Sequence, residues 1–334
     1  MRRIVLVTLM TAFALLVTGL VFASRQPHQQ GVAFRNGDVT LAGTLYTPRS
    51  TGPHPAVIFI HGSGDDSREN YRLYADLLAK NGIAALVYDK RGVGASTGSW
   101  KQSPFSALAD DALAGIQFLR NHRSVDPQRV GAWGGSEGGV IAPWIASRSP
   151  DVAFVIMQAA TGVTFAEQNL YQNEQRIRAH TTSEDEIAQG LQIVKLQAHY
   201  ARTGEGWRSY ADAKEAARVY PWSSALGPVI SADSWWWTWY RTKLDFDPIP
   251  IMERVRVPVL SVWGERDRLV PVAKSRTAIE DALRRGGNQD VTCSVYAGAD
   301  HSIQVNSALH GFGPDPRYLN DLTTWVRKRT GLSR

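Results

Sequence analysis

The amino-acid sequence, 334 residues long, predicts an α/β fold with a mostly parallel eight-stranded sheet, helices on both faces and an inserted helical cap. Short β-type runs alternate with amphipathic helical runs over residues 32–160 and again over 248–330, which is the pattern of a parallel sheet covered on both faces. Between them, residues 161–247 lose this rhythm and carry helical signals instead. A content of 43% hydrophobic and 20% charged residues fits a folded chain rather than a disordered one. We therefore expect one core built from the two outer segments and a cap built from the middle one.

The first 23 residues differ from the rest of the chain. Arg2 and Arg3 precede an uncharged, largely apolar stretch at residues 4–22, and the small residue Ala23 follows it. This order is typical of a secretory signal peptide that is cleaved after Ala23, although the stretch is also near the length of a membrane anchor. In both cases we expect an exported protein, which is periplasmic or secreted if the segment is removed and attached to a membrane by residues 4–22 if it is kept.

Charge and cysteine content argue against two classes of protein. The net charge of +6 falls to +4 without Arg2 and Arg3, and the sequence has no dense basic patch with interleaved aromatic residues, so nucleic acid is not an expected partner. Cys293 is the only cysteine in the sequence, so export is not accompanied by an internal disulfide.

The core is expected to begin with an antiparallel hairpin at one edge of the sheet, because two β-type runs flank the turn sequence Asn36-Gly37-Asp38. Six further β-type runs predict the remaining strands. In chain order, the eight expected strands are residues 32–35, 39–46, 56–60, 83–88, 130–133, 152–157, 258–263 and 291–296.

Helix signals lie between these strands. Apolar residues recur at helical spacing after the third strand and again after the fourth, where Ser103 is expected as the N-cap and Pro104 in the first turn. In the middle segment, Ser183-Glu184-Asp185-Glu186 fits a capping box at the start of an amphipathic helix. The last two expected helices are residues 272–285 and 318–328.

Five glycines surround one serine in "VGAWGGSEGGV", residues 130–140. Glycine loses more conformational freedom on folding than other residues, so this density needs a geometric reason. Gly134-Gly135-Ser136-Glu137-Gly138 satisfies G-x-S-x-G between an expected strand and an expected helix, which is the context that a nucleophilic serine on a sharp turn requires. The glycines would let the strand and the helix approach each other, and the Ser136 hydroxyl would be exposed at the carboxyl end of the sheet.

A serine hydroxyl needs a base to take its proton, and the base needs a partner that orients it. His301 in "AGADHSI" follows the last expected strand, and Asp267 in "GERDRLVP" follows the strand before it, so both lie at the same edge of the sheet as Ser136. Two other acids compete with Asp267: Glu265 lies in the same loop, and Asp151 precedes a strand rather than following one. Asp300 is expected to be a loop or cap residue, because the side chains of consecutive residues diverge.

This constellation resembles the α/β-hydrolase family, and more narrowly the serine esterases and peptidase-like hydrolases that are similar to dienelactone hydrolase. The order Ser136, Asp267, His301 is the order that this family uses. The resemblance extends over nearly all of the chain after the N-terminal segment and includes His61-Gly62-Ser63-Gly64 and the loop "DKRGVGAS" at residues 89–96. It implies the α/β-hydrolase fold and says little about the substrate.

By the same resemblance, His61-Gly62-Ser63 would form the loop that binds the oxyanion of a tetrahedral intermediate through backbone N–H groups. Glu137, directly after the nucleophile, would supply one N–H group. Ser63 would supply the other, with Gly62 as the second choice. His61 is expected to shape this loop rather than to act as a catalyst.

The middle segment also contains "SWWWTWY", residues 234–240. Rings placed this densely on a helix point all round its axis, so some must pack in the core of the segment while others are free to line a pocket or to face a lipid surface. Core packing is the simpler interpretation of each ring alone, and together they suggest an apolar acyl pocket under the cap. The residues of this candidate pocket are Trp235, Trp236, Trp237, Trp239 and Tyr240.

Together these features predict an exported serine hydrolase that cleaves carboxylic esters through Ser136, His301 and Asp267 and an acyl-enzyme. Its partner would be a small-molecule ester or acyl substrate. The sequence contains no H-E-x-x-H or Walker-type motif, and residues 92–98 fit a dinucleotide-binding pattern poorly because the third glycine lies one place late, so neither a cofactor nor a metal is expected. Two alternatives stay open: a peptidase or amidase with the same triad, and a non-catalytic binding protein that retains the fold.

Overall fold

The structure is a computed structural model that describes residues 26–307 and 311–332. The expected signal segment, residues 1–23, lies outside the described residues. None of the helices within the two described ranges combines the length and the hydropathy that crossing a bilayer requires.

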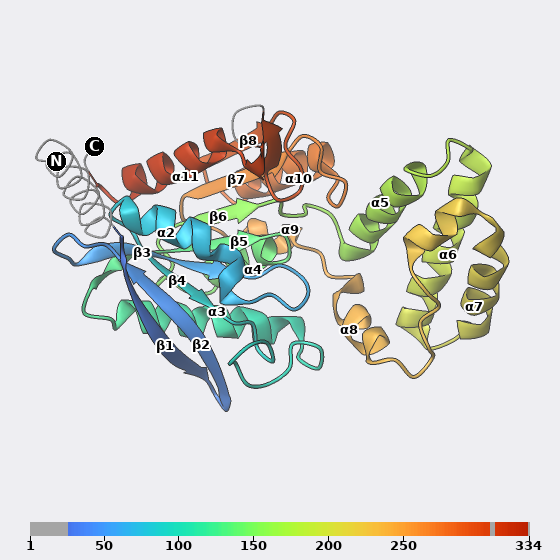
Figure 1. Cartoon of the computed structure of the whole chain (residues 1–334), viewed down its shortest axis with the longest axis horizontal. Helices are drawn as coiled ribbons and strands as arrows, with labels where there is room; N and C mark the ends of the chain where they lie inside the picture. The colour runs from blue at the N-terminus through green and yellow to red at the C-terminus, as the bar shows by residue number, and fades with distance from the viewer. Residues whose placement is uncertain (1–25, 308–310, 333–334) are drawn as a thin grey trace, which may run out of the picture.

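The core is an eight-stranded sheet with the strand order β1-β2-β4-β3-β5-β6-β7-β8, which confirms the predicted α/β architecture (Figure 1). β1 and β2 form the predicted antiparallel hairpin at one edge, β2 is antiparallel to β4, and the other neighbouring strands run parallel. β3 lies near the centre of the sheet, and all seven of its residues are buried. The strands are β1 (His28–Asn36), β2 (Val39–Thr47), β3 (His54–Ile60), β4 (Ala84–Tyr88), β5 (Val125–Gly135), β6 (Val155–Gln158), β7 (Val259–Gly264) and β8 (Val291–Tyr296).

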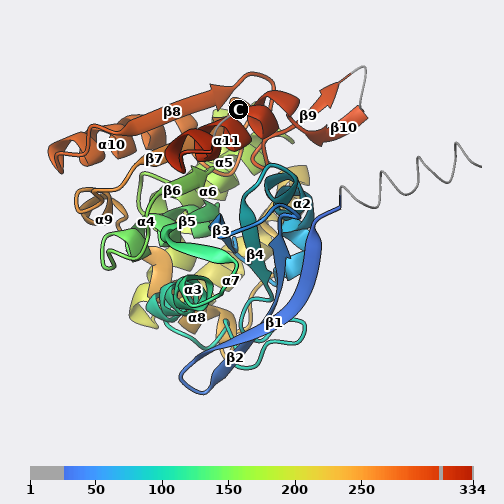
Figure 2. The same cartoon turned by 90° about the vertical axis from the view of Figure 1, so that its left-hand side faces the viewer.

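Helices cover both faces of the sheet, and Figure 2 shows α2 and α3 on opposite sides of it. Side chains alternate along β3: Val57 and Phe59 belong to the hydrophobic core on the side of α2 and α11, whereas Ile58 and Ile60 belong to the core on the side of α3, α4 and α10. This alternation is what a parallel strand buried on both faces requires. The helices are α2 (Arg72–Lys80), α3 (Phe105–Arg120), α4 (Gly138–Ala146), the short α9 (Ile249–Met252), α10 (Val272–Arg285) and α11 (Pro316–Arg329).

Between β6 and β7 the chain leaves the core and forms the helical segment, defined here as residues 165–244, which lies beside the carboxyl ends of the parallel strands (Figure 1). It has an apolar core of its own, which contains Ile177, Trp222 and Trp237. The hydroxyl of Ser183 accepts a hydrogen bond of 3.3 Å from the Glu186 N–H, so the second helix begins where its capping sequence predicts. The helices are α5 (Phe165–Arg178), α6 (Glu184–Thr203), α7 (Trp207–Ala216) and α8 (Trp235–Leu244), with 3-10 turns at Ala217–Val219 and Pro221–Leu226.

The ends of several strands differ by a few residues from the prediction, as at β5, which begins at Val125 rather than at residue 130. Two other local details also differ. The N-cap of α3 is Pro104 rather than Ser103, whose hydroxyl instead accepts a hydrogen bond from Arg91 Nη1 and donates one to the Ser99 carbonyl. A small hairpin, β9 (Gln304–Ser307) and β10 (Gly311–Pro314), follows the main sheet and was not predicted. Its strands are four residues long and the second is rich in glycine and proline, so the sequence lacks the alternation that indicates a strand.

Candidate active site

Ser136 lies on the turn between β5 and α4, with a positive φ of 54°. The adjacent glycines are required by how closely the chain passes itself there. A Cβ atom on Gly134 would lie 1.9 Å from the Gly138 carbonyl oxygen, and one on Gly138 would lie 2.3 Å from the Ile60 carbonyl oxygen. The Ser136 N–H donates a hydrogen bond of 2.8 Å to the carbonyl of Gln158 at the end of β6, which ties the turn to the neighbouring strand.

His301 and Asp267 are joined by a hydrogen bond of 2.8 Å between His301 Nδ1 and Asp267 Oδ2. The other carboxylate oxygen, Oδ1, accepts the backbone N–H groups of Leu269 and Val270 at 2.7 Å and 3.0 Å. Because an ionised carboxylate can only accept, this geometry places the imidazole proton on Nδ1 and leaves the lone pair on Nε2. A contact that the sequence did not reveal supports the loop from above: the Tyr171 hydroxyl on α5 donates to the backbone carbonyl of Asp267 at 3.2 Å.

Glu265, an alternative acid, and Asp300, the expected loop residue, both form hydrogen bonds within their own part of the structure. Glu265 Oε2 accepts the Gly298 N–H at 2.9 Å. Asp300 Oδ1 accepts the N–H groups of Ser302 and Gln304 at 2.9 Å and 3.0 Å. The structure therefore brings Asp267, and not these alternatives, to the imidazole of His301.

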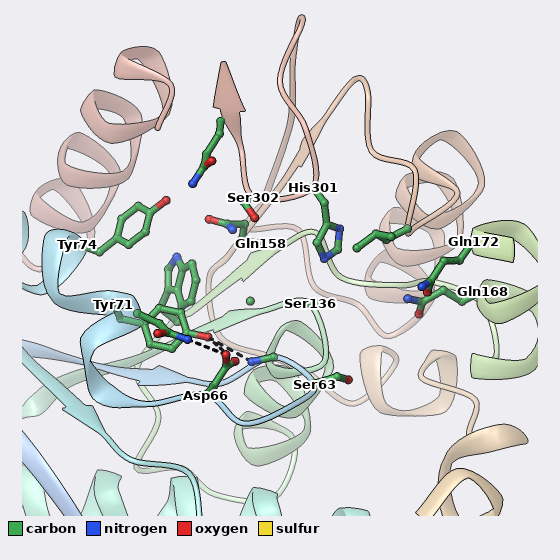
Figure 3. Close-up of a pocket in the computed structure, with 16 residues that line it drawn as sticks. Ser63, Asp66, Tyr71, Tyr74, Ser136, Gln158, Gln168, Gln172, His301 and Ser302 are labelled. Atoms are coloured by element: carbon green, nitrogen blue, oxygen red, sulfur yellow. Dashed lines mark hydrogen bonds between the residues drawn. The ribbon is translucent and has the colours of Figure 1, made fainter. Parts of the chain in front are cut away.

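Ser136 and His301 line the same cavity, which has a volume of about 470 Å³. Figure 3 shows the imidazole projecting into this cavity on the side where Ser136 lies. Within the described part of the chain, neither the Ser136 hydroxyl nor His301 Nε2 makes a hydrogen bond to another protein group. In free enzymes the bond between a nucleophile and its base is often long and tightens only with substrate, so both groups are placed to act on a molecule bound between them.

The backbone N–H groups expected to bind an oxyanion differ in their present partners. The Gly62 N–H donates to the Tyr71 hydroxyl at 3.2 Å, and that hydroxyl in turn donates to Asp66 Oδ2. In the described part of the chain, the N–H groups of Ser63 and Glu137 have no hydrogen-bond acceptor. The N–H groups of Ser63 and Glu137, which are the first choice from the sequence, are therefore unbonded, whereas the N–H group of Gly62 already has an acceptor.

A buried charged cluster, the Glu137 cluster (Glu137, Lys90 and Lys243), lies directly beside Ser136. Glu137 Oε1 is 3.2 Å from Lys90 Nζ, and Glu137 Oε2 accepts hydrogen bonds from Lys243 Nζ and from the Ser63 hydroxyl. Lys90 also donates to the Gly62 carbonyl at 2.7 Å. The cluster therefore joins the turn that carries Ser136, the loop after β3 and α8 of the helical segment.

Charge interactions keep the carboxyl of this cluster ionised. Burial alone would raise the pKa of Glu137, but the charges of Lys90 and Lys243 and the hydrogen bonds from Lys243 and Ser63 outweigh it and lower that pKa to about 2. Burial lowers the pKa of Lys243, and the attraction of Glu137 only partly offsets this effect. No sequence motif indicates this cluster, because Lys243 is 106 residues from Glu137 and only the tertiary fold brings them together.

His61 has the structural role that was expected of it. Its ring is buried, and Nε2 lies 2.6 Å from the Tyr88 carbonyl, to which it donates. Burial, with a contribution from the charge of Lys90, lowers the pKa of His61 to about 3, so the ring stays neutral. His61 is not among the residues that line the cavity around Ser136.

The expected aromatic pocket is corrected by the structure, because none of its five residues is among those that line the cavity around Ser136. Trp237 and Tyr240 are buried in the core of the helical segment. Trp236 stacks on Tyr240, Trp239 packs over Lys243, and Trp235 lies against Trp100 with 44% of its surface exposed. The composition of "SWWWTWY" indicated buried rings but not the direction in which each one points.

The cavity is lined instead by polar side chains that no motif revealed, above all Gln158, Gln168 and Gln172 (Figure 3). Over residues 26–307 and 311–332, no group of three or more histidine, cysteine or acidic residues is arranged to hold a metal ion.

Comparison with known proteins agrees with this geometry. The family model described as alpha/beta hydrolase fold matches residues 55–308, which is more than half of the chain. The chain belongs to the α/β-hydrolase family. This α/β hydrolase is 23% identical to the esterase EstD of Thermotoga maritima over 314 residues, which are 89% of this chain and 68% of EstD.

A shorter match links this α/β hydrolase to the quorum-quenching protein AidA of Acinetobacter baumannii, with 32% identity over 128 residues, 38% of this chain but only 42% of AidA. Among solved structures, the Pyrococcus furiosus esterase Pf2001 has the same fold, with a TM-score of 0.57 and 17% identity, covering 91% of this chain and 90% of that one. These findings establish an α/β-fold hydrolase with esterases among its relatives. They do not test the narrower similarity to dienelactone hydrolase, which stays a prediction.

Proposed function

We propose that this α/β hydrolase is a serine hydrolase that cleaves carboxylic esters through an acyl-enzyme. The observation that carries the proposal is the bond of 2.8 Å between His301 Nδ1 and Asp267 Oδ2, on an imidazole that shares its cavity with Ser136. With the proton held on Nδ1, Nε2 is the nitrogen that can receive the proton of the Ser136 hydroxyl.

In this mechanism, Ser136 Oγ attacks the ester carbonyl carbon while its proton passes to His301 Nε2. Asp267 stabilises the imidazolium that forms. The imidazolium then gives the proton to the departing alkoxide oxygen, so an alcohol leaves and the acyl group stays on Ser136. Water attacks the acyl-enzyme, again with His301 as the base, and releases a carboxylic acid and the free hydroxyl.

The negative charge that develops on the former carbonyl oxygen would be stabilised by the N–H groups of Ser63 and Glu137. One such donor contributes roughly 10²- to 10³-fold to kcat. Their positions depend on the Glu137 cluster, because the carboxylate of Glu137 bonds the Ser63 hydroxyl and Lys90 bonds the Gly62 carbonyl. Donors held by buried partners need no reorganisation when the charge appears, which supports this assignment.

The choice of an ester substrate is supported by the similarity to a protein named as an esterase, EstD. The same residues would also cleave an amide, so the experiment compares both bonds. The proposal includes export of the protein, which rests on the composition of residues 1–23. Sequencing the N-terminus of the protein recovered from outside the cytoplasm would test that part.

The experiment measures turnover of p-nitrophenyl acetate and butyrate beside aminoacyl p-nitroanilides, together with labelling by a fluorophosphonate probe. We expect ester turnover and labelling of Ser136, and we expect Ser136→Ala to abolish the labelling and to lower kcat/KM by at least about 10³-fold. Ser209→Ala is the matched control, because Ser209 is exposed on α7 and does not line the cavity.

Three outcomes would contradict the proposal in different ways. Labelling or turnover retained by Ser136→Ala would show that Ser136 is not the nucleophile. Faster cleavage of the anilides than of the esters would indicate that the protein acts on amides rather than on esters. Absence of both turnover and labelling in the native protein would favour a binding protein that retains the fold.

A further inference from the structure

The cavity around Ser136 is lined mainly by side chains that form hydrogen bonds. Four of its sixteen lining residues are glutamines, namely Gln158, Gln168, Gln172 and Gln304, and the apolar part of the lining comes from Leu269 and from the rings of Tyr71, Tyr74 and Trp133. An apolar acyl chain gains free energy on binding only where it meets apolar surroundings. The composition of this cavity therefore favours a polar substrate over a long-chain ester.

Gln158 is the most informative of these residues because it lies directly beside the nucleophile. Its backbone carbonyl accepts the Ser136 N–H at 2.8 Å, so its side chain begins next to the turn that carries the hydroxyl. The residue is only 7% exposed, and Oε1 is buried without a hydrogen-bond partner in the described chain. Of the eight buried side-chain atoms that lack a partner among the described residues, it is the one whose residue lines this cavity, so a ligand bound there could supply the missing bond.

Gln168 and Gln172 lie four residues apart on α5, so they share one face of that helix. Figure 3 shows both side chains reaching the cavity from the helical segment, on the side of Ser136 opposite to Tyr71 and Tyr74. Within the described residues, neither carboxamide has a hydrogen-bond partner in the protein. The helical segment thus contributes hydrogen-bonding groups to the cavity rather than the aromatic rings that its sequence suggested.

A carboxamide both donates and accepts hydrogen bonds, and a hydroxyl group matches it in both respects. A negatively charged substrate would be expected to meet a lysine or arginine, and none is among the described residues that line the cavity. The lining carboxylate, Asp66, accepts one hydrogen bond on each oxygen, from Asn70 and from Tyr71. The four glutamine carboxamides carry no charge, so the groups that dominate the lining match a substrate that offers hydroxyl groups.

We propose that the substrate is a small, uncharged ester that carries a hydroxyl group near the scissile carbonyl, and that Gln158 binds this hydroxyl. This inference rests on the proposed ester hydrolysis and adds the class of substrate to it. Gln158 is a specificity-determining residue in this scheme. Loss of its carboxamide removes the discrimination between a hydroxylated ester and its hydrocarbon counterpart, because a site built to bond a hydroxyl rejects a substrate that lacks it.

The test uses two pairs of esters that differ by a hydroxyl on either side of the scissile bond. Methyl 3-hydroxybutyrate against methyl butyrate examines the acyl side, and glycerol monobutyrate against propyl butyrate examines the alcohol side. We expect the native protein to prefer the hydroxylated member of at least one pair by about tenfold or more in kcat/KM. The pair that shows the preference identifies the side on which the hydroxyl lies.

Gln158→Met keeps the length of the side chain and removes its hydrogen-bonding groups. We expect this variant to lose most of the preference, and to keep or raise the midpoint of thermal unfolding, because it replaces an unbonded buried amide by an apolar group of similar shape. Gln175→Met is the matched control, because Gln175 lies on α5 but does not line the cavity.

The outcomes separate this inference from the proposed function. Equal rates within both pairs for the native protein, or an unchanged preference in Gln158→Met, would overturn the assignment of Gln158 while ester hydrolysis stands. A large fall in the unfolding midpoint of Gln158→Met would show that the carboxamide serves the fold instead. Failure to cleave any ester, including p-nitrophenyl acetate, would remove the proposed function and this inference with it.

Discussion

Ser136 and Glu137 are neighbours in the sequence, but their side chains lie in opposite physical situations. The Ser136 side faces a cavity in which the hydroxyl, His301 Nε2 and the Gln158 oxygen lack protein partners within the described chain. The Glu137 side is a buried cluster in which both carboxylate oxygens are bonded, to Lys90 and Lys243 among others. Polar groups that lack partners and also line the cavity are available to a ligand, whereas the bonded groups of the cluster hold the neighbouring loops in place.

The comparison implies opposite responses to mutation. Replacing an unbonded polar group at the cavity by an apolar group of similar shape removes no hydrogen bond within the protein, so activity should change while stability stays or rises. Replacing one member of a buried charged cluster leaves other charges uncompensated, so stability should fall.

The largest effect is expected for Asp267→Asn, which keeps the shape of the side chain. The two backbone N–H groups at Oδ1 require an oxygen there, so the amide nitrogen of the variant would face His301 Nδ1. That arrangement forces the proton onto Nε2, and the imidazole can no longer accept the proton of Ser136. We expect kcat/KM for p-nitrophenyl acetate to fall by roughly 10³- to 10⁴-fold.

Glu265→Gln is the control for this prediction, since Glu265 lies in the same loop and its side chain bonds only the Gly298 N–H among described groups. We expect it to keep kcat/KM within about threefold of the native value, as surface substitutions away from a site usually do. If Glu265→Gln lost as much activity as Asp267→Asn, the acid of the site would have been assigned to the wrong residue.

On the other side of the comparison, Glu137→Gln should destabilise the protein strongly. The substitution leaves the buried ammonium groups of Lys90 and Lys243 without their shared counter-charge. We expect the free energy of unfolding in urea to fall by roughly 3–5 kcal/mol. Lys243→Met should lower it less, because Glu137 keeps Lys90, and Lys195→Met on the exposed face of α6 should leave it nearly unchanged. A larger loss in Lys243→Met than in Glu137→Gln would contradict the role of the carboxylate as the centre of the cluster.

The buried groups His61 and Glu137 should make the protein sensitive to acid. The pKa of His61 is lowered from 6.5 to about 3, so the folded protein keeps this ring neutral while the unfolded chain takes up a proton. The contribution of His61 to stability is therefore complete above pH 6.5 and is lost as the pH falls from there towards 3. The slope reaches about 1.4 kcal/mol per pH unit for one such group. Glu137, whose pKa is lowered from 4.5 to about 2, adds a second loss of the same sign below pH 4.5.

Urea unfolding of the native protein and of His61→Gln between pH 7 and pH 4.5 would measure this slope. The native protein should lose stability more steeply than the variant over this range, even if the variant is less stable at pH 7. His180→Gln, at an exposed position, serves as the control and should follow the native slope. Identical slopes for native protein and His61→Gln would show that His61 does not carry the acid sensitivity.

The strands and the residues around Ser136 could be predicted from the sequence, whereas the Glu137 cluster and the polar wall of the cavity could not. The strands and Ser136 could be predicted because each depends on a few consecutive residues: an apolar run for β3, and glycines that a tight turn requires for Ser136. Asp267 and His301 were found because each follows a strand, and the carboxyl ends of parallel strands share one edge. These signals are local, and the parallel sheet converts them into proximity.

The Glu137 cluster and the polar cavity wall have no local signal. Lys243 meets Glu137 across 106 residues, and a lysine on an amphipathic helix ordinarily indicates a solvated face. The aromatic run at residues 234–240 shows the reverse case, in which a strong local signal misled. Its rings satisfy the core of the helical segment, and a helix of known composition can still be rotated about its axis by the packing of its neighbours.

The smallest effect is expected for Trp235→Ala, which tests whether any of these rings contacts substrate. Trp235 is 44% exposed, packs edge-on against Trp100 and lies 5.1 Å from Lys101 Nζ, so its ring rests on the surface rather than in the cavity. We expect kcat/KM for p-nitrophenyl acetate and for longer acyl esters to change by less than about twofold, with a loss of about 0.5–1 kcal/mol in the free energy of unfolding from the cation–π contact. Trp237→Ala, buried in the segment's core, should instead cost about 3–5 kcal/mol, because it leaves a cavity the size of an indole ring. A selective loss of activity on long acyl chains in Trp235→Ala would show that Trp235 contacts the acyl chain. It would then contradict the inference that polar groups without partners bind the substrate.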